Sequence, residues 1–262
     1  MTPPLLARVA KAAARRSAPR EWEYRGTRWP TEGSMRGWNV ESVVARQRAD
    51  WNDLAQVMHS TRSVAGDVVA HNTRMCFGYV LGLASSGKSG LSILDWGGGL
   101  GQYGLMARAL YPHLTIDYHC RDLPLMTDAG RQLLPDATFY DADDEAFAQR
   151  YDLVMASSSL QYVEDWRSIL ARLAESTRRH LFVTRQPLVD SASAFVMVQR
   201  PIVHGYDTEY PGWALNRGEF LSAVTGHGLG LKREFLTGGQ PVVPGAPEQP
   251  VDRGFLFERL AE

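Results

Sequence analysis

Residues 91–101 have the sequence LSILDWGGGLG, a short apolar run followed directly by a glycine-rich turn. An apolar run of this length, bounded by glycines, is typical of a buried strand in a parallel sheet. Glycine lets the backbone turn tightly and lets another group approach where a Cβ atom would collide. Apolar residues resume at 105–110, where a helix would present unpaired N–H groups at its start. The stretch therefore predicts a strand, a ligand-binding turn and a helix.

The rest of the chain continues this alternation of strands and helices. Two helices (40–58 and 68–84) are predicted upstream of the turn, after an irregular aromatic segment at 21–33. Downstream, the pattern predicts strands at 115–120, 138–140, 153–156 and 181–184, with helices at 126–134 and 166–175. Such spacing is typical of βαβ units around a mostly parallel sheet.

The carboxyl-terminal part departs from this rhythm. A predicted helix at 218–224 is followed by strands at 230–236 and 253–259 with no helix between them, which predicts an antiparallel hairpin. We therefore expect an α/β, Rossmann-like fold with a mostly parallel seven-stranded sheet and a C-terminal antiparallel hairpin. Residues 1–66 are expected to form an N-terminal helical and irregular extension. Residues 67–262 would form the main domain, with a substrate-lid insertion at about 186–216.

Composition narrows the class of protein. The chain has 262 residues, 44% hydrophobic and 22% charged, with a net charge of -1, unlike a strongly basic nucleic-acid binder. No apolar run approaches the ~20 residues of a spanning helix, and the basic, Ala-rich start lacks a signal-peptide core. The only cysteines, Cys76 and Cys120, are too few for a disulfide framework, so we expect reduced thiols and a cytoplasmic location. The basic start could form a helix that contacts a membrane surface or a partner subunit, as in a homodimer.

Acidic and hydroxyl side chains follow several of the predicted strands. Asp95 begins the spacing Asp-x-Gly-x-Gly-x-Gly, which continues through Gly97, Gly99 and Gly101 and includes Gly98. This spacing favours binding of S-adenosylmethionine, whose amino-acid end would cross the turn with its ammonium near Asp95. Asp122, followed by Leu123, is placed after the second strand to accept the ribose hydroxyls, and Asp141 after the third could accept from adenine. The small residues Ser157 and Ser158 end the fourth strand at the sheet edge where such folds bind ligands.

The same glycines also fit a different cofactor. Residues 99–104 match Gly-x-Gly-x-x-Gly, the dinucleotide fingerprint, so a nicotinamide-dependent reductase is an alternative. Asp95, two residues before the first glycine, and the C-terminal hairpin both favour S-adenosylmethionine over a nicotinamide cofactor. A non-catalytic, methyltransferase-like partner protein is a third alternative, and the intact acids and glycines argue against it.

The sequence resembles the class I S-adenosylmethionine-dependent methyltransferases, and among them a group often encoded with bacterial polysaccharide genes. The resemblance covers roughly residues 90–235. It rests on residues 93–101, on 121–124 with Gly130, on 151–154, on 159–165, and on 184–188 and 217–220. It implies S-adenosylmethionine as methyl donor and a saccharide hydroxyl as acceptor. The Ala- and Arg-rich composition suits an actinobacterium, and the resemblance then implies the enzymes that methylate mycobacterial polymethylated polysaccharides as similar systems.

The insertion at about 186–216 supplies the expected acceptor side, because the fifth strand delivers it to the carboxyl edge of the sheet. An alcohol needs help in losing its proton, and His204 is the candidate general base, oriented by Glu209 or Asp207. The candidate sugar-binding residues include aromatic rings that could pack on the sugar and polar groups that could bind its hydroxyls. They are Tyr206, Tyr210, Trp213, Arg185 and His71. His71 and His119 are the alternative bases. The acids of the insertion lack a tight ligand spacing, so no metal is expected.

Overall fold

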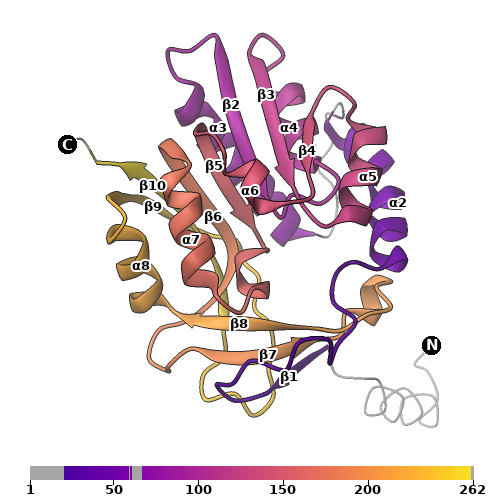
Figure 1. Ribbon diagram of the computed structural model, residues 1–262, viewed down its shortest axis with the longest axis vertical. Helices are drawn as coiled ribbons and strands as arrows, with labels where there is room; N and C mark the ends of the chain where they lie inside the picture. Colours follow the sequence, from indigo (N-terminus) through magenta and orange to yellow (C-terminus); the bar gives the residue numbers. More distant parts are fainter. Residues whose placement is uncertain (1–20, 59, 61–66, 261–262) are drawn as a thin grey trace, which may run out of the picture.

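The computed structural model describes residues 21–58, 60 and 67–260 (Figure 1). The expected basic helix at the amino terminus lies outside these residues. None of the helices within the described ranges combines the length and hydrophobicity that a membrane crossing requires. Both cysteines of this part of the chain carry free thiols.

The main sheet has the predicted strands in the predicted directions. Its order is β4 (Thr138–Tyr140), β3 (Thr115–Arg121), β2 (Gly90–Trp96), β5 (Tyr151–Ser157), β6 (Thr177–Val189), β10 (Val251–Arg259) and β9 (Leu229–Leu236). The first five strands are parallel to one another. β10 pairs antiparallel with both β6 and β9, so the expected C-terminal hairpin lies in the sheet. The α/β Rossmann-like fold is confirmed.

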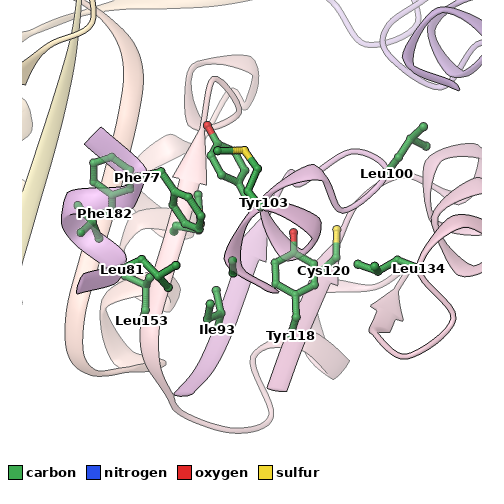
Figure 2. Packing of buried hydrophobic residues seen from close by; sticks show 14 of the residues in the cluster. Phe77, Leu81, Ile93, Leu100, Tyr103, Tyr118, Cys120, Leu134, Leu153 and Phe182 are labelled. Atoms are coloured by element: carbon green, nitrogen blue, oxygen red, sulfur yellow. The ribbon is translucent and has the colours of Figure 1, made fainter. Parts of the chain in front are cut away.

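Helices cover both faces of this sheet. One face carries α2 (Glu41–Met58), α3 (Val68–Ser85), α4 (Gln102–Leu110) and α5 (Pro124–Leu133), and the other carries α6 (Asp143–Ala146), α7 (Trp166–Glu175) and α8 (Arg217–Thr225). Successive residues of β2 serve opposite faces: Ile93 joins the core with Phe77 of α3, and Leu94 joins the core with Leu170 of α7. This alternation follows from the period-two geometry of a strand. Figure 2 shows the first of the two cores.

A second, small sheet forms at the carboxyl end of the parallel strands. It consists of β1 (Trp22–Tyr24), β7 (Phe195–Gln199) and β8 (Tyr210–Asn216), all antiparallel (Figure 1). The short 3-10 turn η2 (Ile202–His204) connects β7 to β8. The sequence predicted an irregular segment at 21–33 and a substrate-lid insertion at about 186–216, without assigning strands to either. Strand β1 pairs with residues almost 180 positions away, as in Trp22 opposite Gln199, and local patterns do not reveal such pairing.

Strand β6 is longer than the predicted 181–184 and joins the two sheets. Its last residues, Leu188 and Val189, pair in parallel with β8, and Leu188 also pairs with the start of β10. The insertion therefore begins after Val189, several residues later than expected. Because β8 continues the edge of β6, the small sheet is held directly over the carboxyl ends of β5 and β6, next to the turn η1 (Leu160–Tyr162).

Candidate functional site

The glycine loop between β2 and α4 needs glycine for its own conformation and packing. Gly97, Gly99 and Gly101 have φ angles of +72°, +61° and +88°, in the left-handed region that favours glycine. A Cβ atom on Gly97 would lie 2.3 Å from the Ser159 Cβ, and one on Gly99 would lie 2.7 Å from the Gln47 Oε1. The loop is thus closely surrounded by the protein itself, with the side chain of Gln47 from α2 over its middle.

Asp95 lies beneath this loop, with its side chain fully buried. Its Oδ2 accepts a hydrogen bond from the Tyr118 hydroxyl at 2.5 Å, and a Cβ atom on Gly98 would lie 2.6 Å from the same oxygen. Burial raises the pKa of Asp95 to about 7, although the Tyr118 hydrogen bond opposes the rise. The Asp95 Oδ1 has no hydrogen-bond partner among the described residues, and the expected contact of Asp95 with a ligand ammonium group stays a prediction. The carboxyl supports the loop from inside, because it lies directly against Gly98.

Asp122 lies just after β3 with its carboxylate against the loop. Oδ2 accepts the Gly99 N–H at 2.7 Å, and Oδ1 accepts the Leu123 N–H at 2.7 Å, where α5 begins. Burial raises the pKa of Asp122, and both backbone hydrogen bonds oppose that rise. Each carboxylate oxygen can accept a second hydrogen bond. The predicted role of Asp122 toward ribose hydroxyls is compatible with this arrangement.

Asp141, the predicted adenine contact, is exposed after β4. Its Oδ1 accepts from the Arg131 guanidinium at 3.0 Å and from the Thr127 hydroxyl. The neighbouring acid Asp143 accepts the Trp96 indole N–H at 2.8 Å, which ties the end of β2 to α6. The role of Asp141 toward a ligand stays a prediction.

The serines at the end of β5 lie beside the start of α4. The Ser157 hydroxyl is 2.7 Å from the Tyr103 hydroxyl, whose ring packs on Phe77 (Figure 2). Ser158 has a φ of +53°, and its N–H donates to the Thr184 carbonyl of β6 at 2.9 Å. Its Oγ accepts from the Gln161 side chain at 3.0 Å. The end of β5 is thus linked to the glycine-loop helix on one side and to β6 on the other.

Arg185 occupies an irregularity in β6. Val183 pairs with Phe255 and Gln186 pairs with Arg253, so two β6 residues, Thr184 and Arg185, face the single residue Gly254. This is a β-bulge, which bends a strand and re-aims its side chains. Arg185 has a φ of +54° and is exposed. The bulge therefore makes Arg185 a candidate residue of the site.

Several titratable groups interact electrostatically with the Arg185 side chain. Burial raises the pKa of each of them, and the positive charge of Arg185 opposes the rise in Tyr103, Tyr162, Tyr206, Tyr210 and Asp252. These groups come from α4, η1, the β7–β8 connection, β8 and β10. Arg185 is therefore at the centre of the region where both sheets and the glycine-loop helix meet.

Several of the buried polar atoms without a hydrogen-bond partner among the described residues belong to these strand ends: the Gln161 Oε1, the Thr184 Oγ1, both amide atoms of Gln186, and the Asp252 Oδ1. Others lie elsewhere, among them the Asp95 Oδ1 beneath the glycine loop and the His180 Nδ1. Buried polar groups are nearly always paired in folded proteins, so each such atom requires an explanation. The grouping of those at the strand ends beside Arg185 indicates a surface prepared for a polar ligand.

The aromatic residues of the insertion pack on rings from outside it. Trp38 stacks on Tyr210 with ring centroids 4.0 Å apart, and Tyr162 meets both rings edge-on at 5.0 Å. Tyr210 is only 2% exposed, so it cannot offer a ring face to a sugar, which corrects that expectation. Trp213 stacks on Trp29 at 5.3 Å, and strand alternation directs it away from Tyr210. Tyr206 and Trp213 are both partly exposed, and Tyr206 is the one that lies beside Trp38.

The expected grouping of His204 with Glu209 and Asp207 is not formed. Each acid is held by an arginine instead: Glu209 by Arg200 at 2.8 Å, and Asp207 by Arg36 at 3.1 Å. His204 is exposed on η2, with its Nε2 3.4 Å from the Glu21 Oε1. The correction has a simple cause, since long arginine side chains from distant segments reach these carboxylates first. His71 is exposed in the first turn of α3.

Two functional candidates escaped the sequence analysis. Asp252 begins β10, and the antiparallel pairing of β10 with β6 brings it to the carboxyl edge beside Arg185. The predicted hairpin contained the signal, because the first residues of an antiparallel last strand must lie at that edge. Gln186, next to the singled-out Arg185, is fully buried with unpaired amide atoms, which no sequence pattern indicates. Within the described ranges, no group of three or more His, Cys, Asp or Glu side chains could hold a metal ion.

A family model described as a methyltransferase domain matches residues 69–230 of the chain, and the chain belongs to this family. The site therefore lies in a methyltransferase, an enzyme with the fold of S-adenosylmethionine-dependent methyltransferases. This membership decides against the nicotinamide-dependent alternative, as does the hairpin at the end of the sheet.

Solved structures share the fold at low sequence identity. A proposed sarcosine dimethylglycine methyltransferase from Galdieria sulphuraria superimposes with a TM-score of 0.51 at 13% identity, covering 80% of this chain and 98% of that one. A SAM-dependent methyltransferase from Methanosarcina mazei gives a TM-score of 0.50 at 13% identity, covering 67% and 95%. The mitomycin 7-O-methyltransferase gives 0.48 at 17% identity, and the match spans 81% of this chain but 54% of that longer enzyme. No protein of curated function matches the sequence.

Proposed function

We propose that this enzyme transfers a methyl group from S-adenosylmethionine to a hydroxyl group of a sugar or oligosaccharide. The observation that carries the proposal is the group of buried, unpaired polar atoms on Gln161, Thr184, Gln186 and Asp252. They lie at the carboxyl ends of β5 and β6, next to the helix that follows the glycine loop. Open α/β sheets bind their ligands at this edge.

The residues of the loop fit the methyl donor. S-adenosylmethionine supplies an electrophilic methyl group on a sulfonium when it is bound. Asp122 would hold the ribose hydroxyls, because its two oxygens already face the loop through the Gly99 and Leu123 N–H groups. Gln47 from α2 lies over Gly99 and would cover the amino-acid end. Asp95 would keep the loop in place from below.

The acceptor side favours a molecule with many hydroxyl groups. An amide such as Gln186 can donate and accept at once, while the Asp252 Oδ1 and the Gln161 Oε1 accept. A sugar presents alternating donors and acceptors that would satisfy such a set. The resemblance to methyltransferases encoded with polysaccharide genes favours the same acceptor. Tyr206, partly exposed beside Trp38, is the ring best placed to contact a C–H face of the sugar.

Asp252 is the candidate that we favour for taking the hydroxyl proton. Burial raises the pKa of its carboxyl, which makes it a stronger base than an exposed aspartate, and Arg185 opposes the rise. Its Oδ1 has no partner among the described residues. His204 remains a second candidate, although its neighbour is Glu21 and the acids expected to orient it are bound to arginines. Alignment of the hydroxyl with the methyl group would supply most of the remaining rate.

A transfer assay tests this function directly. The purified protein is incubated with S-adenosylmethionine that carries an isotope-labelled methyl group, together with matched acceptor sets of monosaccharides, short oligosaccharides, phenols and amines. We expect label in a sugar ether, located by fragmentation mass spectrometry. Label only in a phenol or an amine would contradict the sugar acceptor while leaving the methyltransferase assignment intact.

A further inference from the structure

Arg185 is held in a conformation that costs free energy. Within the described residues, Ser158 and Arg185 are the two non-glycine residues with positive φ, and they lie on adjacent strand ends. Left-handed backbone is disfavoured for such residues and persists where the surrounding structure enforces it, often at functional sites. The β6 bulge enforces it for Arg185. The backbone therefore sets where this long cationic side chain leaves the strand, at the edge of the site.

Arg200 and Arg217 form ion pairs with carboxylates, whereas Arg185 does not. Arg200 pairs with Glu23 at 2.7 Å and with Glu209 at 2.8 Å, and Arg217 pairs with Glu234 at 2.5 Å. No carboxylate in the described part of the chain forms such an ion pair with Arg185. A guanidinium presents a planar fork of donors that matches a carboxylate or a phosphate.

The groups that feel this charge are mostly on the acceptor side. Tyr162, Tyr206, Tyr210 and Asp252 come from η1, the small sheet and β10, whereas Tyr103 alone belongs to the glycine-loop helix. The unpaired amide of Gln186 adjoins Arg185 in the sequence. An anion bound by Arg185 would thus lie among the groups proposed to hold the acceptor.

We propose that the acceptor sugar carries an anionic group, a carboxylate or a phosphate, and that Arg185 binds it. This inference rests on the proposed function, because it concerns the molecule whose hydroxyl group is methylated. The anion would fix which hydroxyl faces Asp252 and the methyl group. Neutral sugars would bind without this anchor and with lower affinity.

The test measures binding separately from methyl transfer. Protein saturated with S-adenosylhomocysteine and labelled with ¹⁵N-arginine is titrated with methyl glucuronide, glucose 6-phosphate and neutral methyl glucoside. The variants are Arg185→Gln and Arg185→Lys, and the matched control is Arg233→Gln, which removes an exposed positive charge on β9. The side-chain resonance of Arg185 is the one that disappears in both Arg185 variants.

We expect at least one of the two anionic sugars to shift this resonance and to bind the wild type about 10- to 100-fold more tightly than Arg185→Gln, the usual worth of a charge-assisted contact. Arg233→Gln should bind like the wild type, and the affinity for S-adenosylhomocysteine should change less than twofold in either Arg185 variant. The carboxylate and phosphate arms identify which anion is preferred.

Three results would overturn the inference. They are equal binding of charged and neutral sugars, an Arg185 resonance that no anionic sugar moves, and a tenfold loss of S-adenosylhomocysteine affinity in Arg185→Gln, which would assign the arginine to the cofactor. Its failure is distinguishable from that of the proposed function. If neutral sugars are methylated with unchanged kcat/KM in Arg185→Gln, only the proposed anionic group is contradicted. If an anion binds at Arg185 but no sugar is methylated, only the proposed sugar acceptor is contradicted.

Discussion

The backbone N–H of Gly99 donates to the Asp122 Oδ2 at 2.7 Å, which joins the glycine loop after β2 to the acid after β3. The two residues are 23 positions apart in the sequence, and the parallel pairing of β2 with β3 brings them together. The same carboxylate is thus both a support for the loop and the group proposed to accept the ribose hydroxyls. Any change at Asp122 should affect the donor site more than the rest of the fold.

Asp122→Ala should weaken the binding of S-adenosylhomocysteine by roughly 1.5–3 kcal/mol, the usual worth of hydrogen bonds to a charged group. Isothermal titration calorimetry measures the change. Asp117→Ala is the matched control, because Asp117 lies on the same strand but is exposed and contacts His119. Equal dissociation constants for Asp122→Ala and the wild type would remove Asp122 from the donor site.

Gly99→Ala should weaken the binding of the same ligand, because its Cβ atom would enter the contact between the loop and the Gln47 Oε1. Gly26→Ala is the control: Gly26 also has positive φ, +80°, but a Cβ atom there meets nothing within 4 Å. Both variants carry a backbone strain of about 1–2 kcal/mol. Only Gly99→Ala should lose affinity in calorimetry, and equal affinities in the two variants would show that the loop does not bind the cofactor.

Asp95→Asn should change the pH dependence of stability. The pKa of Asp95 is raised from 3.8 to about 7 by burial, so the folded protein holds this proton where the unfolded chain has lost it. Stability from this group is complete below about pH 4 and is lost as the pH rises to about 7, with a slope of up to about 1.4 kcal/mol per pH unit.

Urea unfolding of the wild type and Asp95→Asn across this range measures the effect. The stability of the wild type relative to the variant should fall from pH 4 to pH 7 and then stay level, because asparagine does not titrate. A difference that is flat, or that grows in favour of the wild type, would show that Asp95 ionises normally beneath the loop.

Asp252→Asn should lower kcat about 100-fold or more if Asp252 takes the hydroxyl proton, with little change in cofactor affinity. In the wild type, kcat should rise with pH as the carboxyl loses its proton, through a pKa above the ordinary aspartate value because of burial. Steady-state kinetics of Asp252→Asn and His204→Ala compare the two candidates. A variant Asp252→Asn that keeps its kcat, beside a strongly impaired His204→Ala, would return the role to His204.

The parts of the fold that depend on local patterns could be predicted from the sequence. The strand and turn at residues 91–101 are encoded by a continuous apolar run and by glycines at the positions with positive φ. The antiparallel hairpin follows from two strands without a helix between them. These features are sufficient for the fold and for the cofactor loop.

The acceptor side could not be predicted in the same way. Arg36 and Asp207 are 171 positions apart, and Trp22 pairs with Gln199 through a sheet whose strands have no strong individual pattern. The partner of a carboxylate depends on which side chains the folded chain brings near it. Asp207 and Glu209, close to His204 in the sequence, are therefore paired with Arg36 and Arg200. A pattern of residue types in the insertion indicates a polar and aromatic region, but not which rings are already stacked.

A crystal structure of the protein with bound S-adenosylhomocysteine would show whether the methyl donor binds at the glycine loop. We expect the ligand to lie over residues 97–101, with its ribose hydroxyls within hydrogen-bond distance of Asp122 and its sulfur facing Arg185 and Asp252. A ligand bound away from this loop would show that the glycine loop is not the donor site, and a sulfur directed away from Arg185 and Asp252 would place the acceptor elsewhere.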